Sequence, residues 1–346
     1  MKYSIILILI LNFSVFGQKI SSHDISDIKS DVFNDSLYVL DHTFPKGDAR
    51  RYIVSAESAK SKHPFTNKTR LTTALDIAEK TGVKMHFPSG YYGMDLILDN
   101  RQNLYLSFDD SEFNLIHITQ EYDSLPKPKN IFIDGNIISY HRLGITEAEN
   151  IKIDSVNIKS DILKNLRGVR SKGCHIYHGS TNISIGYLQI DDFGSGSNKY
   201  LHNDAALAID GWNNNPKQVT IKKLYIKSSD RHGIYLTGSN HFIGEAVIDK
   251  YGVGGSDHMS QMQDALAGEE KKFKALWVNK AYNSRIGKLT INEKESEGHY
   301  SIHLDYSDVK RPVIIYKLNI INSPDAKILE EVNNGVLITD KKGIKE

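Results

Sequence analysis

The sequence predicts an all-β protein whose strands wind into a parallel β-helix, a solenoid closed at its N-terminal end by a helix. Three observations predict this fold: a recurring aliphatic pattern, a second alternating segment before most of its copies, and variable spacing between the copies. Of the 346 residues, 40% are hydrophobic and 25% are charged. This composition is typical of a globular chain and excludes disorder, collagen and coiled coil.

Residues 1–17, MKYSIILILILNFSVFG, have the features of an export signal. Lys2 supplies positive charge, an unbroken apolar run follows, and Val15 and Gly17 fit the small-residue rule for cleavage. The apolar run is shorter than the ~20 residues that a membrane-spanning helix needs. No cysteine follows the run, so a lipid anchor is not expected. We therefore expect cleavage before Gln18, no membrane anchor afterwards, and a periplasmic or secreted protein.

An N-terminal extension over residues 18–65 precedes the predicted β-helix domain, residues 66–325. The domain opens with LTTALDIAEKTG, residues 71–82, which predicts a helix that ends at Gly82. Four apolar residues share one face of this helix: Leu71, Ala74, Leu75 and Ala78. We expect the helix to cover the open end of the coils, where an unpaired strand edge would otherwise be exposed. Residues 326–346 are expected to form a C-terminal cap and tail.

The repeat is a six-residue pattern with aliphatic residues at its first and fourth positions and Ile at its sixth, as in IDSVNI, residues 153–158. It begins at six positions: Ile153, Ile185, Ile221, Ile243, Ile286 and Ile315. The starts are 32, 36, 22, 43 and 29 residues apart, which indicates loops of variable length on a constant core. Each coil would stack its aliphatic residues on the next, so that no coil is stable alone.

A second strand with period-two alternation precedes the last five copies. Its inward residues align on Ile176, Leu207, Ile234, Leu276 and Ile302. The next position then faces outward and forms a column of Tyr177, Ala208, Tyr235, Trp277 and His303. Because adjacent coils lie ~4.8 Å apart, this column beside mostly small residues predicts a shallow trough with an aromatic wall suited to sugar rings. The alternative is that the rings only stabilise the stacked strands.

The chain resembles the right-handed β-helix enzymes of the pectate-lyase/pectin-lyase-like superfamily over about residues 66–325. The similar segments are TALDIAEKTG followed by VKMHFPSGYY, and the coils NISIGYLQI, HGIYLTGSN and NSRIGKLTI. The resemblance implies a right-handed parallel β-helix with an N-terminal capping helix. It is weak for function, since the superfamily includes polysaccharide lyases, glycoside hydrolases, epimerases and phage tailspikes. An exported, disulfide-free chain with a Gly-Gln junction also resembles polysaccharide-utilisation proteins of marine Bacteroidota. This implies a uronate-oligosaccharide dehydratase or lyase of the kind that processes ulvan.

The predicted reaction is β-elimination on a uronate of an acidic oligosaccharide or polysaccharide. A base removes the C5 proton, a cation neutralises the carboxylate and an acid protonates O4; the enzyme is a lyase if O4 carries a sugar and a dehydratase if O4 is a free hydroxyl. The candidate bases are His232 and His175, and the candidate acids are Tyr235 and Tyr177. The residues expected to contact substrate are Arg170, Asp204, Arg231, Lys274, Trp277, His299 and His303.

Two other functions stay open. A hydrolase would need two carboxyl groups ~5–9.5 Å apart, and Asp204 with Asp230 is the best pair. The segments NDAALAI and DRHGIYLTGS resemble parts of polygalacturonase-like hydrolases, although no second Asp follows Asp204 and Arg231 replaces the first glycine. Arg231 could instead pair with Asp204. The third function is a non-catalytic β-helix that binds sugars.

The sequence predicts no cofactor and assigns no metal, with a divalent cation left open. The insertion at residues 249–272 carries Asp257, His258 and Asp264 and could cover the trough, but its spacing matches no calcium loop or zinc motif. Lys and Arg total 43 against 42 for Asp and Glu, which excludes nucleic-acid binding by bulk charge. The single cysteine, Cys174, excludes an internal disulfide.

Overall fold

The computed structural model describes residues 25, 28–29, 32–161, 163–164, 170–194, 203–253, 273–294, 296, 301–323, 328–330 and 335–343. The expected signal segment lies outside these residues, as do His299 and the three polar residues of the long insertion, Asp257, His258 and Asp264. No helix within the described ranges is long and apolar enough to cross a membrane.

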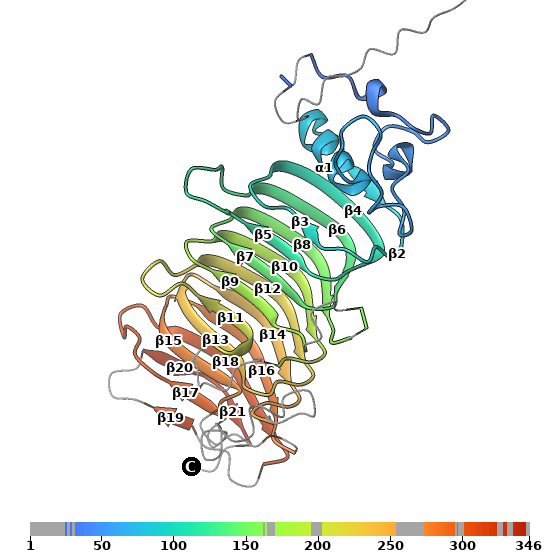
Figure 1. The fold of residues 1–346 in the computed structure, drawn as a ribbon. Helices are drawn as coiled ribbons and strands as arrows, with labels where there is room; N and C mark the ends of the chain where they lie inside the picture. The colour runs from blue at the N-terminus through green and yellow to red at the C-terminus, as the bar shows by residue number, and fades with distance from the viewer. Residues whose placement is uncertain are drawn as a thin grey trace, which may run out of the picture.

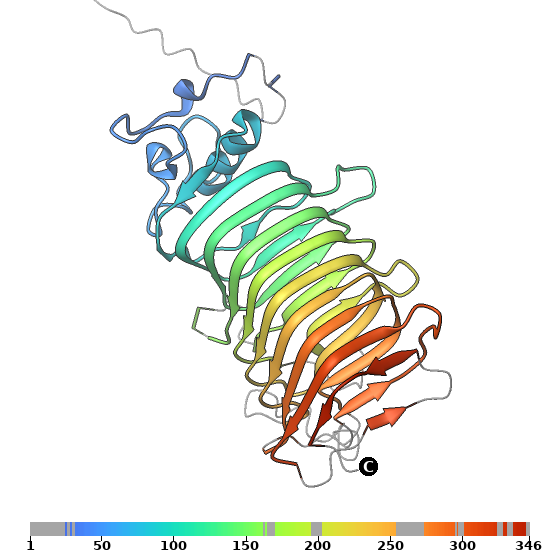
Figure 2. The same cartoon turned by 180° about the vertical axis from the view of Figure 1, so that it is seen from behind.

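The chain forms a right-handed parallel β-helix, as predicted (Figures 1 and 2). Its strands build two stacks in which every pairing is parallel. The long-strand stack consists of β4 (Gln102–Phe113), β6 (Lys129–Ser139), β8 (Glu149–Ile158), β10 (Thr181–Ile190), β12 (Lys217–Ile226), β14 (Phe242–Ile248), β16 (Arg285–Asn292) and β18 (Val313–Ile321). At its ends, β1 (Met85–Phe87) and β2 (Gly90–Tyr91) pair with β4, and β20 (Val336–Ile338) and β21 (Lys341–Lys342) pair with β18.

The short-strand stack carries the candidate site. It consists of β3 (Leu96–Ile97), β5 (Ile116–Thr119), β7 (Arg142–Thr146), β9 (Gly173–Tyr177), β11 (Ala205–Asp210), β13 (His232–Ser239), β15 (Leu276–Tyr282), β17 (Ile302–Leu304) and β19 (Ile328–Glu330). Each strand contributes one segment to one coil. Outward side chains from successive coils therefore lie side by side although they are distant in sequence.

The predicted capping helix is confirmed as α1 (Arg70–Thr81), which lies at the N-terminal end of the solenoid (Figure 1). The Thr69 hydroxyl accepts a hydrogen bond from the backbone N–H of Thr72 at 3.1 Å, and Gly82 ends the helix with φ 65°. All four predicted face residues are at most 2% exposed. The short 3-10 helices η3 (Asp35–Tyr38) and η4 (Ala49–Tyr52) place Tyr38 and Tyr52 in the same core.

The predicted repeat is confirmed, because all six starting isoleucines are paired in register along the long-strand stack. Two coils upstream, β4 and β6, also belong to the repeat, and the sequence pattern missed them. In β6 the register shifts between Ile133 and Asn136, which adds one residue to the spacing. Gly135 lies at this bulge with φ 84°, where a Cβ would approach the carbonyl oxygen of Phe108 to 2.1 Å.

Asparagines mark one corner of the early coils. Asn103, Asn130, Asn150 and Asn182 all have φ between 56° and 57°. From Asn130 onward, each side-chain amide donates to the side-chain oxygen of the preceding coil's asparagine, at 2.8 Å, 2.7 Å and 3.1 Å in succession. This asparagine ladder fits the corner, since Asn tolerates the left-handed conformation better than most residues.

Candidate functional site

The outward aromatic column differs from the prediction at its first member, which is His175 rather than Tyr177 beside Ala208. Ala208 pairs with His175, and Asp210 pairs with Tyr177, so the placement of Tyr177 beside Ala208 is wrong by two residues. A slip of two keeps every side chain on the same face, so alternation alone could not detect it. The observed column is Gly144, His175, Ala208, Tyr235, Trp277 and His303.

The small residues expected beside this column do not all face outward. Ala206 and Ala275 belong to the hydrophobic core rather than to the outer face. His232 and Lys274 are at most 5% exposed and pack against Trp277. The His232 ring centroid is 5.2 Å from the Trp277 ring centroid, and the Lys274 ammonium is 5.3 Å from it.

Asp204 lies immediately before β11, and the pKa of its carboxyl group is strongly raised. Burial, reinforced by the negative charge of Asp230, raises the pKa of its carboxyl to about 7, although the charges of Arg231 and Lys172 oppose the shift. Its Oδ2 atom is buried and has no hydrogen-bond partner among the described residues. A carboxyl with a pKa near 7 can both take up and release a proton at neutral pH.

His175 and Tyr177 lie next to each other on β9, with ring centroids 5.0 Å apart. Burial, together with the charges of Arg142 and Lys172, lowers the pKa of His175 to about 3, so its ring is neutral. Its Nε2 atom is buried and lacks a hydrogen-bond partner in the described part of the chain. Burial and the charges of Asp210 and Asp204 raise the pKa of Tyr177, so its hydroxyl stays protonated.

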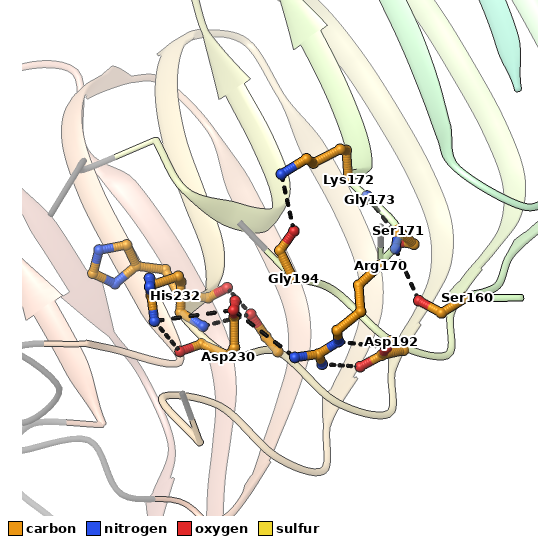
Figure 3. A network of polar contacts seen from close by, with 11 residues as sticks. Ser160, Arg170, Ser171, Lys172, Gly173, Asp192, Gly194, Asp230 and His232 are labelled. Carbon is orange, nitrogen blue, oxygen red and sulfur yellow. Dashed lines mark hydrogen bonds and ion pairs between the residues drawn. The ribbon is translucent and has the colours of Figure 1, made fainter. Parts of the chain in front are cut away.

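Lys172 supplies a cation that the sequence analysis missed. Its ammonium donates to the carbonyl oxygen of Gly194 at 3.2 Å (Figure 3). Burial lowers its pKa, and the charges of Asp204 and Asp230 counteract the shift. Extending the observed β9–β11 register two residues back places Lys172 beside Ala205, in the column of His232. Lys172 could therefore have been identified as a site residue from the sequence if the register between these two strands had been predicted correctly.

Arg170 and Arg231 were predicted to hold the substrate carboxylate, but both guanidinium groups are internal. Arg170 binds Asp192 with two nitrogens, one at 2.7 Å, and lies 3.9 Å from Asp230 (Figure 3). Arg231 lies 4.0 Å from the same oxygen of Asp230 and 4.9 Å from the ring centroid of Phe273. The side chains of Arg231 and Asp230 are 0% exposed, so contact with a surface ligand would require them to move.

The far end of the column is a packed ladder. Trp277 stacks on His303 with centroids 4.8 Å apart and meets the Tyr235 ring edge-on at 5.5 Å. Tyr235 is 2% exposed and accepts a hydrogen bond from the Asn279 amide at 3.2 Å. His303 lies four coil steps, ~19 Å, from His175. The structure thus brings Asp204, His175, Tyr177 and Lys172 together, and it separates them from His303.

His232 is also fully buried, and the backbone N–H of Lys274 donates to its Nδ1 atom at 3.1 Å. In the neutral ring the proton is then on Nε2, which can donate but cannot accept. This geometry argues against the role of His232 as the base.

Across the described ranges, no three His, Cys, Asp or Glu side chains group in a way that could hold a metal ion. The absence of a cofactor stays a prediction. Protein-family models, curated proteins and solved structures were all compared with the chain, and none of them matches it.

Proposed function

We propose that the protein is an exported enzyme that acts on uronic-acid-containing oligosaccharides or polysaccharides, such as the algal polysaccharide ulvan, by β-elimination between C4 and C5 of the uronate. The observation that best supports this is an outward face that carries three titratable groups. They are Asp204, whose pKa is raised to about 7, protonated Tyr177 and cationic Lys172. A base, an acid and a cation are the three groups that this elimination requires.

In the proposed step, the Asp204 carboxylate takes the C5 proton and the C5–H electrons form the C4=C5 double bond. The C4–O4 bond breaks, and Tyr177 gives its proton to O4, which leaves as a sugar hydroxyl or as water. Lys172 and Arg142 neutralise the uronate carboxylate while negative charge develops. Neutral His175 contacts the substrate as a hydrogen-bonding group, since a pKa of about 3 makes it a weak base.

Elimination is favoured over hydrolysis by the placement of Asp230. A retaining or inverting hydrolase needs both carboxyl groups beside the scissile bond. Asp230 has no exposed surface and lies between two guanidinium groups. Its charge acts on Asp204 only from inside the protein.

The first prediction concerns Asp204→Asn. Loss of a general base typically lowers kcat by about 10²–10⁴-fold, and we expect a loss of this size without loss of folding. The measurement is the ultraviolet absorbance of the unsaturated uronate during incubation with ulvan oligosaccharides. With the native protein the rate should fall about tenfold for each pH unit below the Asp204 pKa of about 7, because a protonated carboxyl cannot act as the base.

The matched control is Asp154→Asn, which removes a carboxylate from the exposed side of β8 and should leave the rate unchanged. Full activity of Asp204→Asn would contradict the assignment of the base. New reducing ends without ultraviolet absorbance would indicate hydrolysis, and binding without either signal would indicate a sugar-binding protein. Loss of one water without chain shortening would identify a dehydratase.

A further inference from the structure

A depression lies on the same outward face, toward the N-terminal end of the solenoid. It has a volume of about 490 Å³ and is formed by β3, β5 and β7 with the turns that follow β3 and β5. We call it the N-terminal hollow and define it by Asp95, Asp99, His117, Glu121, Tyr122 and Arg142. None of its residues was singled out by the sequence patterns.

The hollow is aligned with the proposed reaction site. His117 pairs with Gly144, and Gly144 pairs with His175, so the hollow is two coil steps, ~9.6 Å, from His175. Arg142 lines the hollow, and its charge also helps to lower the pKa of His175. Gly144 adds no side chain between the two histidines. One extended oligosaccharide could therefore occupy both places along the solenoid axis.

His117 is held in one orientation. Asp99 Oδ2 is 2.9 Å from His117 Nδ1, and the other Asp99 oxygen accepts from the backbone N–H of Thr119 at 2.7 Å. Arg142 Nη2 lies 3.3 Å from His117 Nε2. Because a guanidinium can only donate, Nε2 is the acceptor and Nδ1 carries the proton toward Asp99.

Acidic groups predominate among the charged side chains of the hollow, and its one guanidinium, Arg142, is shared with the reaction site. Three carboxylates, Asp95, Asp99 and Glu121, face one guanidinium, Arg142. Carboxylates accept hydrogen bonds from sugar hydroxyls but repel sulfate and carboxylate groups. Tyr122 is 69% exposed at the rim and offers a ring face to a sugar.

We propose that the N-terminal hollow is a subsite for an uncharged sugar unit of the same oligosaccharide whose uronate reacts beside Lys172. The proposal rests on the proposed function and deepens it, because it specifies the charge pattern of the substrate: an anionic unit at the reaction site and a neutral unit two coils away. A sulfate or a second uronate at that position is disfavoured.

The experiment measures binding rather than turnover, by titration calorimetry on the Asp204→Asn protein. The probes are ulvan tetrasaccharides before and after chemical desulfation. We expect the desulfated probe to bind about tenfold more tightly, since it removes like-charge repulsion. Glu121→Gln should reduce this preference, and Tyr122→Ala should weaken binding of the desulfated probe about threefold to tenfold. Equal or tighter binding of the sulfated probe, or no binding of either, would overturn the subsite.

Two controls keep the outcomes separate. Glu245→Gln removes a carboxylate from β14 in the long-strand stack and should leave the preference unchanged. The native protein is assayed for unsaturated uronate in parallel. Absence of that product with a retained preference for the desulfated probe would overturn elimination and support the subsite. Formation of that product without a preference for the desulfated probe would support elimination and overturn the subsite.

Discussion

Asp204 and Asp230 show that burial and neighbouring charges, rather than residue type, decide whether a carboxyl group is a candidate for the proposed reaction. Asp204 is desolvated, and its pKa is raised to about 7. Asp230 is enclosed between Arg170 and Arg231 and has no exposed surface. The sequence could name both residues as candidates, but it could not predict their environments, because the surrounding charges come from different coils.

The second prediction concerns His241, whose pKa burial lowers to about 4. Its Nδ1 atom accepts from the backbone N–H of Val219 at 3.1 Å, so the folded state holds the ring neutral. In the unfolded chain the ring binds a proton below about pH 6.5. The free energy of unfolding should therefore fall as pH drops from about 6.5 to 4, with a contribution of up to about 1.4 kcal/mol per pH unit from this residue.

Urea unfolding at pH 7 and pH 5 measures this effect. His241→Gln should be less stable at both values, because it loses the buried hydrogen bonds, but its dependence on pH should be shallower. Exposed His42→Gln should keep the dependence of the native protein. An unchanged dependence in His241→Gln would contradict the role of this ring.

At the scale of elements, two contributions to the stability of the corner can be measured separately: the hydrogen bonds of the asparagine ladder and the tolerance of Asn for the left-handed conformation. Asn150 has φ 56° and takes part in two ladder hydrogen bonds, with Asn130 and Asn182. The third prediction is that Asn150→Gly loses only these bonds, whereas Asn150→Ala also carries the left-handed strain of about 1–2 kcal/mol. Chemical denaturation should thus rank the native protein above the Gly variant, and the Gly variant above the Ala variant.

Asn157, on the same strand β8 but outside the left-handed positions, is the matched control. There the order of the two variants should reverse, since Gly is less favourable than Ala in an extended strand. The same order at both positions would show that the conformation of the corner is not what stabilises it.

The elements also show what the sequence could and could not predict. Aliphatic spacing predicted the coils from Ile153 onward, because stacked coils require the same residue types at the same positions. One extra residue at the bulge of Gly135 hid the coil of β6, and a further extra residue between Phe108 and Ser111 hid the coil of β4. The two-residue slip at Tyr177 was invisible to alternation, and it concealed Lys172. The arrangement of the candidate site was therefore predicted less well than the fold.

At the scale of the whole molecule, α1 protects the end of a single continuous core. Ala78 is fully buried in the cluster that also contains the first strands. The fourth prediction is that Ala78→Asp, by placing a charge there, detaches the helix and exposes the first coil. Size-exclusion chromatography with light scattering should then detect oligomers. Lys80→Ala, a change at a partly exposed position of the same helix, should remain like the native protein, and a monodisperse Ala78→Asp variant would contradict the protective role.

The paired strands give the molecule a fixed unit of length. His117, Gly144 and His175 occupy equivalent places on successive strands, so the interval between the hollow and the reactive groups is a whole number of turns. Duplicating the one turn that lies between them, which carries Arg142 and Gly144, would lengthen that interval by ~4.8 Å. Under the proposed function, the length of saccharide that spans both places would then be set by the number of turns.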